Sequence, residues 1–181
     1  MPDPTAYQWI DDALSDAACV TAVAGATGQE VLAAFGADTS ISLGRDDAYG
    51  YDKYTATVAV HDVPGGVVAL ELNGFQGSLE PVLGRLSRLG PAASIFWNVN
   101  DDNAFTCARD GALVATVDMY DAEDPDDVDL PDDLMSLFVQ ADDEDASMWA
   151  VGMAMVEAFT AVRIGEKAVA AAGPFHPIPG V

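Results

Sequence analysis

The sequence predicts an α+β fold, a single domain (residues 1–181) with a mainly antiparallel sheet and helices packed on it. Three observations support this prediction. Short β-rich runs are joined by hairpin dipeptides, amphipathic stretches follow capping residues, and half of the 181 residues are apolar, enough for one core. We expect an α+β core over 5–120, an acidic loop with two C-terminal helices over 121–165, and an extended tail over 166–181.

The chain is expected to open with a short helix and a buried strand. Thr5 can cap an amphipathic helix that continues to about residue 13. The run 18–23 is short and rich in small and β-branched residues, which is typical of a buried strand.

A second helix is marked at both of its ends. Thr27 and Glu30 have the spacing of a capping box, which predicts a helix over 28–35 that ends at Gly36. The following residues, 38–53, are polar and contain glycine, so we expect a long loop there.

The middle of the chain predicts a hairpin and a third helix. The β-rich runs 54–63 and 67–72 are separated by Pro64-Gly65-Gly66, a composition that favours a tight turn. Ser78 is then expected to cap a helix that ends before Gly90.

Three further strands are expected over 94–99, 104–108 and 113–119. Asp110-Gly111 joins the last two, and this dipeptide is typical of a two-residue hairpin turn. Consecutive hairpins make the sheet antiparallel rather than doubly wound and parallel.

Two segments of the chain read alike. Residues 20–37 and 69–86 both run from a strand through a glycine-containing turn into a helix. One interpretation is a pseudo-repeat of strand–helix–strand units related by a two-fold axis. A chance likeness of two strand-to-helix turns explains the pattern equally well.

After residue 120 the sequence becomes acidic and then helical. An acidic loop over 121–129 precedes a helix over about 132–141. A second helix over about 146–162 is apolar on nearly all sides, which is typical of a helix buried on both sides.

Cys19 and Cys107 both fall in predicted strands. We interpret them as two buried free thiols, and a disulfide between them is the alternative.

The charge excludes several classes of function. The chain has 30 acidic and 7 basic residues, a net charge of −23, and the bases are scattered, so no basic stripe exists for nucleic acid. Residues 1–9 lack the features of a signal peptide, and the apolar stretch 146–162 is shorter than the roughly 20 residues of a membrane span. We therefore expect a cytoplasmic protein that binds neither nucleic acid nor membrane.

The acidic run is the strongest functional feature, because no Lys or Arg lies between Arg109 and Arg163. Helix dipoles explain only part of it, since carboxylates favour the first turn of a helix by about 0.3–1 kcal/mol each. A solvated face is one reading, and docking to a basic protein partner is the other. The candidate partner-binding residues are Asp121, Glu123, Asp124, Asp126, Asp127, Asp129, Asp132, Asp133, Asp142, Asp143, Glu144 and Asp145.

We predict no catalytic residue, metal or cofactor. The Gly-x-Ser-x-Gly context of a nucleophile is absent, and the histidines and cysteines lack metal-ligand spacing. Asp124, Asp126 and Asp127 could share a calcium ion, but the EF-hand spacing is missing. Residues 74–77 before a helix suggest either an anion site or a packing turn.

Several segments spread along the chain form a recognisable set: 73–78 (NGFQGS), 96–100 (FWNVN), 86–88, 110–111, 19–21 and 30–32. Together they resemble an uncharacterised bacterial domain family of unknown function. The resemblance spans about residues 7–165 and implies a small intracellular single-domain protein, with no catalytic residues to transfer. This chain departs from that group in being more acidic and poorer in arginine.

The leading hypothesis is a non-enzymatic acidic binding protein, of immunity or inhibitory type, that docks to a basic protein. The alternative is a small-ligand-binding domain whose acidity serves solubility or salt adaptation, with Asn73, Gln76, Trp97 and Asn98 as weak ligand candidates. An enzyme of unrecognised type is a third reading, which paired carboxylates or His61 in a pocket would favour.

Overall fold

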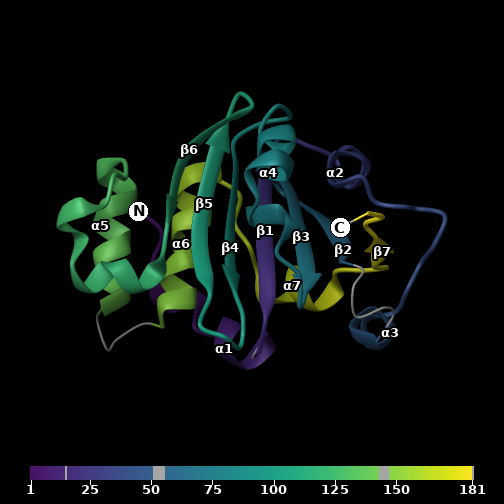
Figure 1. Cartoon of the computed structure of the whole chain (residues 1–181), viewed down its shortest axis with the longest axis horizontal. Helices are drawn as coiled ribbons and strands as arrows, with labels where there is room; N and C mark the ends of the chain where they lie inside the picture. Colours follow the sequence, from purple (N-terminus) through teal and green to yellow (C-terminus); the bar gives the residue numbers. More distant parts are fainter. Residues whose placement is uncertain (15, 51–55, 143–146, 181) are drawn as a thin grey trace.

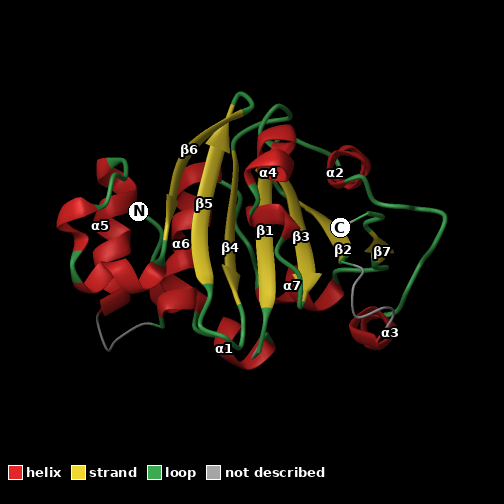
Figure 2. Cartoon of the chain, in the orientation of Figure 1, coloured by secondary structure: helices red, strands yellow, loops and turns green. Residues whose placement is uncertain are grey.

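A single antiparallel sheet with helices on both faces forms the body of the protein (Figures 1 and 2). The computed structural model describes residues 1–14, 16–50, 56–142 and 147–180, of which Tyr49, Gly50 and Asp142 are described by their backbone alone. Within these residues the sheet has seven strands in the order β6-β5-β4-β1-β3-β2-β7. Their bounds are β1 Ala18–Ala24, β2 Thr57–Val63, β3 Gly66–Leu72, β4 Ala92–Trp97, β5 Asn103–Arg109, β6 Ala112–Val117 and β7 His176–Pro177.

The helices divide between the two faces of the sheet. α2 and α4 pack together on one face (Figure 1). The other face is covered by α6, which packs against α5 and the N-terminal turns, and by α7, which lies against β2 and β3. The α-helices are α1 Ile10–Ala13, α2 Gly28–Phe35, α3 Arg45–Gly50, α4 Glu80–Leu86, α5 Asp132–Phe138, α6 Met148–Thr160 and α7 Glu166–Ala171. The 3₁₀ turns are η1 Pro4–Tyr7, η2 Gln76–Ser78, η3 Met119–Glu123, η4 Pro125–Asp127 and η5 Val139–Asp142.

The predicted α+β fold is confirmed, and the strand order is compatible with the repeat that the sequence suggests. The central strands lie in the order β4-β1-β3-β2, so the unit β1–α2–β2 interleaves with the unit β3–α4–β4. β1 and β3 pair antiparallel at the centre, with Thr21 opposite Ala69. This is the split strand–helix–strand arrangement of ferredoxin-like folds. The β5–β6 hairpin extends one side of this unit and β7 the other.

Each face of the sheet has its own apolar core. On the α6 face, Val20, Ile95 and Phe105 pack beneath α6, whose residues 150–156 are all buried. On the α4 face, Val23 and Leu83 belong to a smaller core beneath α2 and α4. The prediction that the last long helix is buried on several sides is therefore confirmed.

Two predicted helix starts are wrong. Asp3, not Thr5, caps the first turn, because the Asp3 carboxylate accepts the Thr5 N–H at 3.0 Å and the Thr5 hydroxyl at 2.8 Å. Ser78 does not cap α4, because its hydroxyl donates to the Phe75 carbonyl and closes η2 instead. In contrast, the capping box of Thr27 and Glu30 is present as predicted.

The tail and the long loop contain more structure than predicted. Residues 166–171 form α7 and His176–Pro177 pair with β2, so the extended tail over 166–181 is wrong in part. Residues 45–50 of the expected loop form α3. The two short helices contact each other, since the Arg45 guanidinium of α3 donates to the Val169 carbonyl of α7 at 2.6 Å. Both short helices thus depend on a partner distant in the sequence.

The two cysteines are free and buried, as expected. Cys107 belongs to the core beneath α6, whereas Cys19 faces η2 on the other side of the sheet. Side chains on opposite faces cannot form a disulfide without rebuilding the sheet.

Candidate functional site

The acidic segment after β6 folds into helical turns that leave its carboxylates in solvent. Ala122, Leu130 and Leu134 are buried and anchor η3, η4 and α5 to the body of the protein. Eight predicted partner-binding acids are described, and all are exposed. We call them the acidic surface: Asp121, Glu123, Asp124, Asp126, Asp127, Asp129, Asp132 and Asp133.

The remaining four predicted acids, Asp142, Asp143, Glu144 and Asp145, cannot be placed in the same way. The backbone of Asp142 ends η5, but its side chain and the three acids after it lie outside the described residues.

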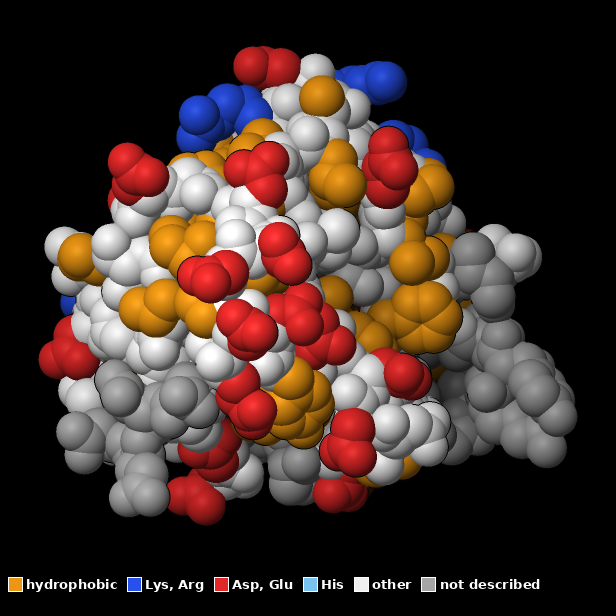
Figure 3. All heavy atoms as spheres, turned by 60° about the vertical axis from the view of Figure 1, so that its left-hand side comes forward, with side chains coloured by type: hydrophobic (Ala, Val, Ile, Leu, Met, Phe, Trp, Pro, Cys, Tyr) orange, Lys and Arg blue, Asp and Glu red, His pale blue; other side chains and the backbone are white. Residues whose placement is uncertain are grey.

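The described acids of the acidic surface are not neutralised by ion pairs. Among the described residues, none of its acids forms an ion pair with Lys or Arg within 4.0 Å. Figure 3 shows acidic groups across this side of the molecule, with Lys and Arg only near its margins. Several arginines are bound elsewhere: Arg85 donates to the Ala34 carbonyl at 2.7 Å, and Arg109 lies 4.9 Å from the centre of the Phe159 ring.

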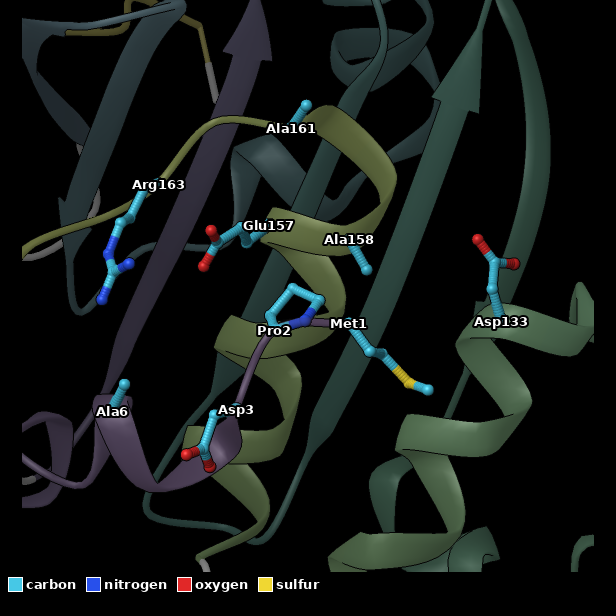
Figure 4. Close-up of a pocket in the computed structure, with 9 residues that line it drawn as sticks. All are labelled: Met1, Pro2, Asp3, Ala6, Asp133, Glu157, Ala158, Ala161 and Arg163. Carbon is cyan, nitrogen blue, oxygen red and sulfur yellow. The ribbon is translucent and has the colours of Figure 1, made fainter.

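A hollow of about 810 Å³ lies between the N-terminal segment, α5 and α6 (Figure 4). Glu157 projects from α6 at this hollow, and its Oε2 accepts the hydroxyl of Tyr7, which is itself buried. Burial and the Glu157 carboxylate both raise the pKa of Tyr7, so Tyr7 stays a donor. We call this the N-terminal hollow; its lining residues are Met1, Pro2, Asp3, Ala6, Asp133, Glu157, Ala158, Ala161 and Arg163.

The N-terminal hollow adjoins the acidic surface through Asp133, which belongs to both. Three carboxylates and one guanidinium line it, beside small apolar side chains. This combination suits the cationic end and the methylenes of a basic side chain.

A second polar site lies buried on the α4 face. Glu71 is 1% exposed, and its carboxylate accepts the Gln76 N–H at 2.9 Å and the Gly77 N–H at 2.7 Å. Burial raises the pKa of Glu71 to about 7 against the lowering effect of the two N–H groups. Together with Cys19 and Thr21, whose Sγ and Oγ1 are 3.7 Å apart, Glu71 forms what we call the Glu71 cluster.

The Glu71 cluster anchors a loop and has no reactive thiolate. Burial, together with the nearby Glu71 charge, raises the pKa of Cys19, which keeps it a thiol. A Cβ at Gly77 would lie 2.2 Å from Thr21 Oγ1, so only glycine allows η2 to approach the strand this closely. The amides of Gln76 and Gly77, which an anion would need, are already bonded to Glu71. Residues 74–77 thus form a packing turn.

The four weak ligand candidates do not line one cavity. Asn73 is exposed at the end of β3, and Gln76 is buried on the α4 face. Trp97 faces α6, where it stacks on Trp149 with ring centres 5.2 Å apart. Asn98 accepts the N–H groups of residues 100 and 102 and so closes the β4–β5 turn.

Sequence reasoning missed Glu71 and the pair of Tyr7 with Glu157. The sequence does contain a feature that could have identified Glu71 and Glu157, a single charged residue within an apolar segment. Glu71 is a lone charge inside the apolar strand VVALEL, and Glu157 is a lone charge inside an apolar helix. Charges in such positions are rarely buried unless they are paired or hydrogen-bonded.

Within the described residues, no group of three or more His, Cys, Asp or Glu side chains could hold a metal ion. No helix in the same part of the chain is long and apolar enough to cross a membrane.

The fold and these sites define a single-domain α+β protein with a seven-stranded antiparallel sheet, an exposed acidic surface and a buried polar cluster. Residues 3–175 match the model of a protein family described as a family of unknown function (DUF6461), and the chain belongs to this family. The expected membership of an uncharacterised family is therefore confirmed. No curated protein and no solved structure matches the chain.

Proposed function

We propose that this chain is a non-enzymatic binding protein that docks a basic protein partner through its acidic surface. The role is that of an immunity-type or inhibitory protein in the bacterial cytoplasm, where two free thiols are stable. One observation carries the proposal: eight exposed carboxylates lie within thirteen residues, and none is paired with a cation of the described chain.

Such a surface can steer and orient a partner. Opposite potentials raise the rate of encounter, and charges at the rim of an interface determine register more than affinity. Affinity then requires apolar or aromatic anchors. Tyr120 in η3 and Val139 in η5 are large, exposed and on contacting elements beside the acids. The N-terminal hollow adds a place for one basic side chain.

Removal of three acids tests the proposal. The surface variant carries Asp126→Asn, Asp127→Asn and Asp129→Asn, which lie in η4 and the loop after it and cap no helix. The matched control removes three exposed acids elsewhere, as Asp12→Asn, Asp16→Asn and Glu80→Gln. Each protein is used to capture partners from the native lysate at about 0.05 M and about 0.5 M salt, where screening lengths differ about threefold.

We expect a basic protein to be retained at low salt by the wild type and the control and to be released at high salt. The surface variant should bind this protein about tenfold more weakly, since each exposed pair contributes about 0.2–1 kcal/mol. Capture that is indifferent to salt and equal for both variants would refute the proposal, as would the absence of any captured protein.

A further inference from the structure

The two edges of the sheet differ in how they are protected. β7 has two residues, one of them Pro177, with Pro179 soon after, and such an edge cannot accept another strand. β6, Ala112–Val117, has six residues without a proline or a charge. Proteins commonly protect an edge of this length with Lys, Pro or a bulge. β6 has neither Lys nor Pro, and its pairing with β5 is irregular at one point, where Cys107 pairs with Ala115 and Ala108 with Leu113.

The outer side of β6 is unpaired. Its backbone pairs with β5, and among the described residues no other backbone group bonds to it. Leu113 is 37% exposed and Val114 46% exposed, so apolar side chains accompany the free N–H and C=O groups. The strand therefore presents both the hydrogen-bonding groups and the apolar contacts that an added strand uses.

This edge faces the same side of the molecule as the acidic surface. In Figure 1, β6 is the outermost long strand on the side where α5 lies, and Figure 3 shows this side with hydrophobic patches between acidic groups. Exposed acids also flank the strand: Asp110 precedes it, and Asp118 follows it directly before η3. At the first end Arg109, opposite Ala112, and Arg88, packed against Gly111, offset Asp110. The negative charge is therefore concentrated at the Asp118 end, where the strand leads into the acidic surface.

We propose that the basic partner adds an extended segment, in which apolar residues alternate with Lys or Arg, as an eighth strand along β6. The inference rests on the proposed function and names how the partner binds. A basic segment is favoured at β6 because its charge is opposite to that of the adjacent acidic surface. A second copy of the chain would bring another net charge of −23 to the same place, which disfavours self-pairing.

The added strand would gain affinity and specificity from separate features. Main-chain hydrogen bonds to β6 provide affinity for any extended backbone. Alternate side chains then fall on the two faces, beside Ala115 and Val117 on the α6 face or beside Leu113 and Thr116, which pair with Ala108 and Thr106, on the α4 face. A Lys or Arg at one end of the segment would lie near Asp118 and the acidic surface.

Two peptides of equal charge test this inference on the full chain. The first alternates Lys and Val over ten residues, and the second alternates Lys and Pro, which cannot form a strand. Affinity is measured by fluorescence anisotropy at about 0.02 M salt, where charges are weakly screened. Hydrogen–deuterium exchange of the backbone amides of 112–117 is followed without peptide and with each peptide.

We expect the Lys–Val peptide to slow the outward amides of β6 at least about tenfold, because exchange then requires release of the peptide. The Lys–Pro peptide should leave these rates unchanged and bind about tenfold more weakly, as the loss of two or more hydrogen bonds implies. Val114→Lys, a charge at the edge, should weaken the Lys–Val peptide about tenfold, and Val99→Lys about twofold. Val99 is 72% exposed and lies in the β4–β5 turn.

The failures of the two proposals are distinguishable. Equal binding of both peptides, with β6 amides still exchanging freely, overturns strand addition but leaves docking to the acidic surface in place. Protection of β6 that grows with protein concentration in the absence of peptide would identify a second copy as the occupant and also overturn the inference. Binding of neither peptide at low salt overturns the inference and the proposed function together.

Discussion

The two faces of the sheet are held by different forces. Beneath α6 the sheet presents mainly apolar residues such as Ile95 and Phe105, and Gly152 lets α6 approach Ile95 closely. The opposite face buries a row of polar side chains across β3, β1, β4 and β5, namely Glu71, Thr21, Ser94 and Thr106. The comparison separates the parts that provide stability from the parts that position a loop.

The polar face gathers most of the segments on which the family resemblance rests. The NGFQGS loop bonds to Glu71 and packs on Thr21. The Gly111 N–H of the Asp-Gly turn donates to the Ser87 hydroxyl at 2.9 Å, so the end of α4 is tied to the β5–β6 hairpin. Directional bonds determine where a loop lies, whereas apolar burial determines how firmly the domain folds. The recognisable segments thus serve the geometry of this face.

The largest effect should come from the apolar face. Phe105→Ala removes a fully buried ring from the core beneath α6. We expect the free energy of unfolding to fall by about 4 kcal/mol, the sum of lost transfer energy and a cavity. Urea denaturation measures this, with Phe105→Leu as the conservative control at about 1 kcal/mol. A loss below about 1 kcal/mol for the alanine variant would show that this face is not the main source of stability.

On the polar face, glycine replacement should have the next largest effect. A methyl group at Gly77 would lie 2.2 Å from Thr21 Oγ1 and 3.1 Å from Glu71 Oε1. We expect Gly77→Ala to lower the free energy of unfolding by about 3 kcal/mol, the upper part of the range for overpacking.

A double-mutant cycle identifies the cause of that loss. Thr21→Ala removes the closest oxygen, so the double variant should recover about 1 kcal/mol relative to the sum of the single changes. Purely additive losses would mean that the close approach of Gly77 to Thr21 is not what requires glycine.

The sequence predicted those elements of the fold that are formed by residues close together in the chain. The capping box of Thr27 and Glu30, the Asp110-Gly111 turn and the alternating runs around them each depend on residues close in the chain. The likeness of residues 20–37 and 69–86 was visible for the same reason, because each segment runs from a strand into a helix within twenty residues. The acidic surface could also be predicted, since a run of charges is rarely buried.

What could not be predicted depends on contacts between distant residues. Arg45 bonds to Val169 across 124 positions, and without that contact neither α3 nor α7 has a strong local pattern. Tyr7 meets Glu157 across 150 positions, and only the folded chain brings these residues together. Glu71 was missed for another reason: alternation places it inside the sheet, where a carboxyl is tolerated only if a later turn supplies donors.

The smallest of the three effects concerns the charge of Glu71, which should make the contribution of the polar face to stability depend on pH. Its pKa is about 7 in the folded protein, against an ordinary value of 4.5. Because the folded pKa is the higher one, its contribution to stability is complete below pH 4.5 and is lost as the pH rises through 7. Between pH 5 and 8 the wild type should lose on the order of 2 kcal/mol relative to Glu71→Gln.

Unfolding free energies measured across this range for both proteins give the difference directly, and the many other carboxylates largely cancel. Glu71→Gln itself starts about 1–3 kcal/mol less stable at low pH, because one amide hydrogen now faces a backbone N–H of the loop. The exposed Glu80→Gln variant should follow the wild-type profile. Parallel plots of unfolding free energy against pH for the wild type and Glu71→Gln would mean that the loop keeps Glu71 charged at no cost. The polar face would then contribute more to stability than its comparison with the apolar face indicates.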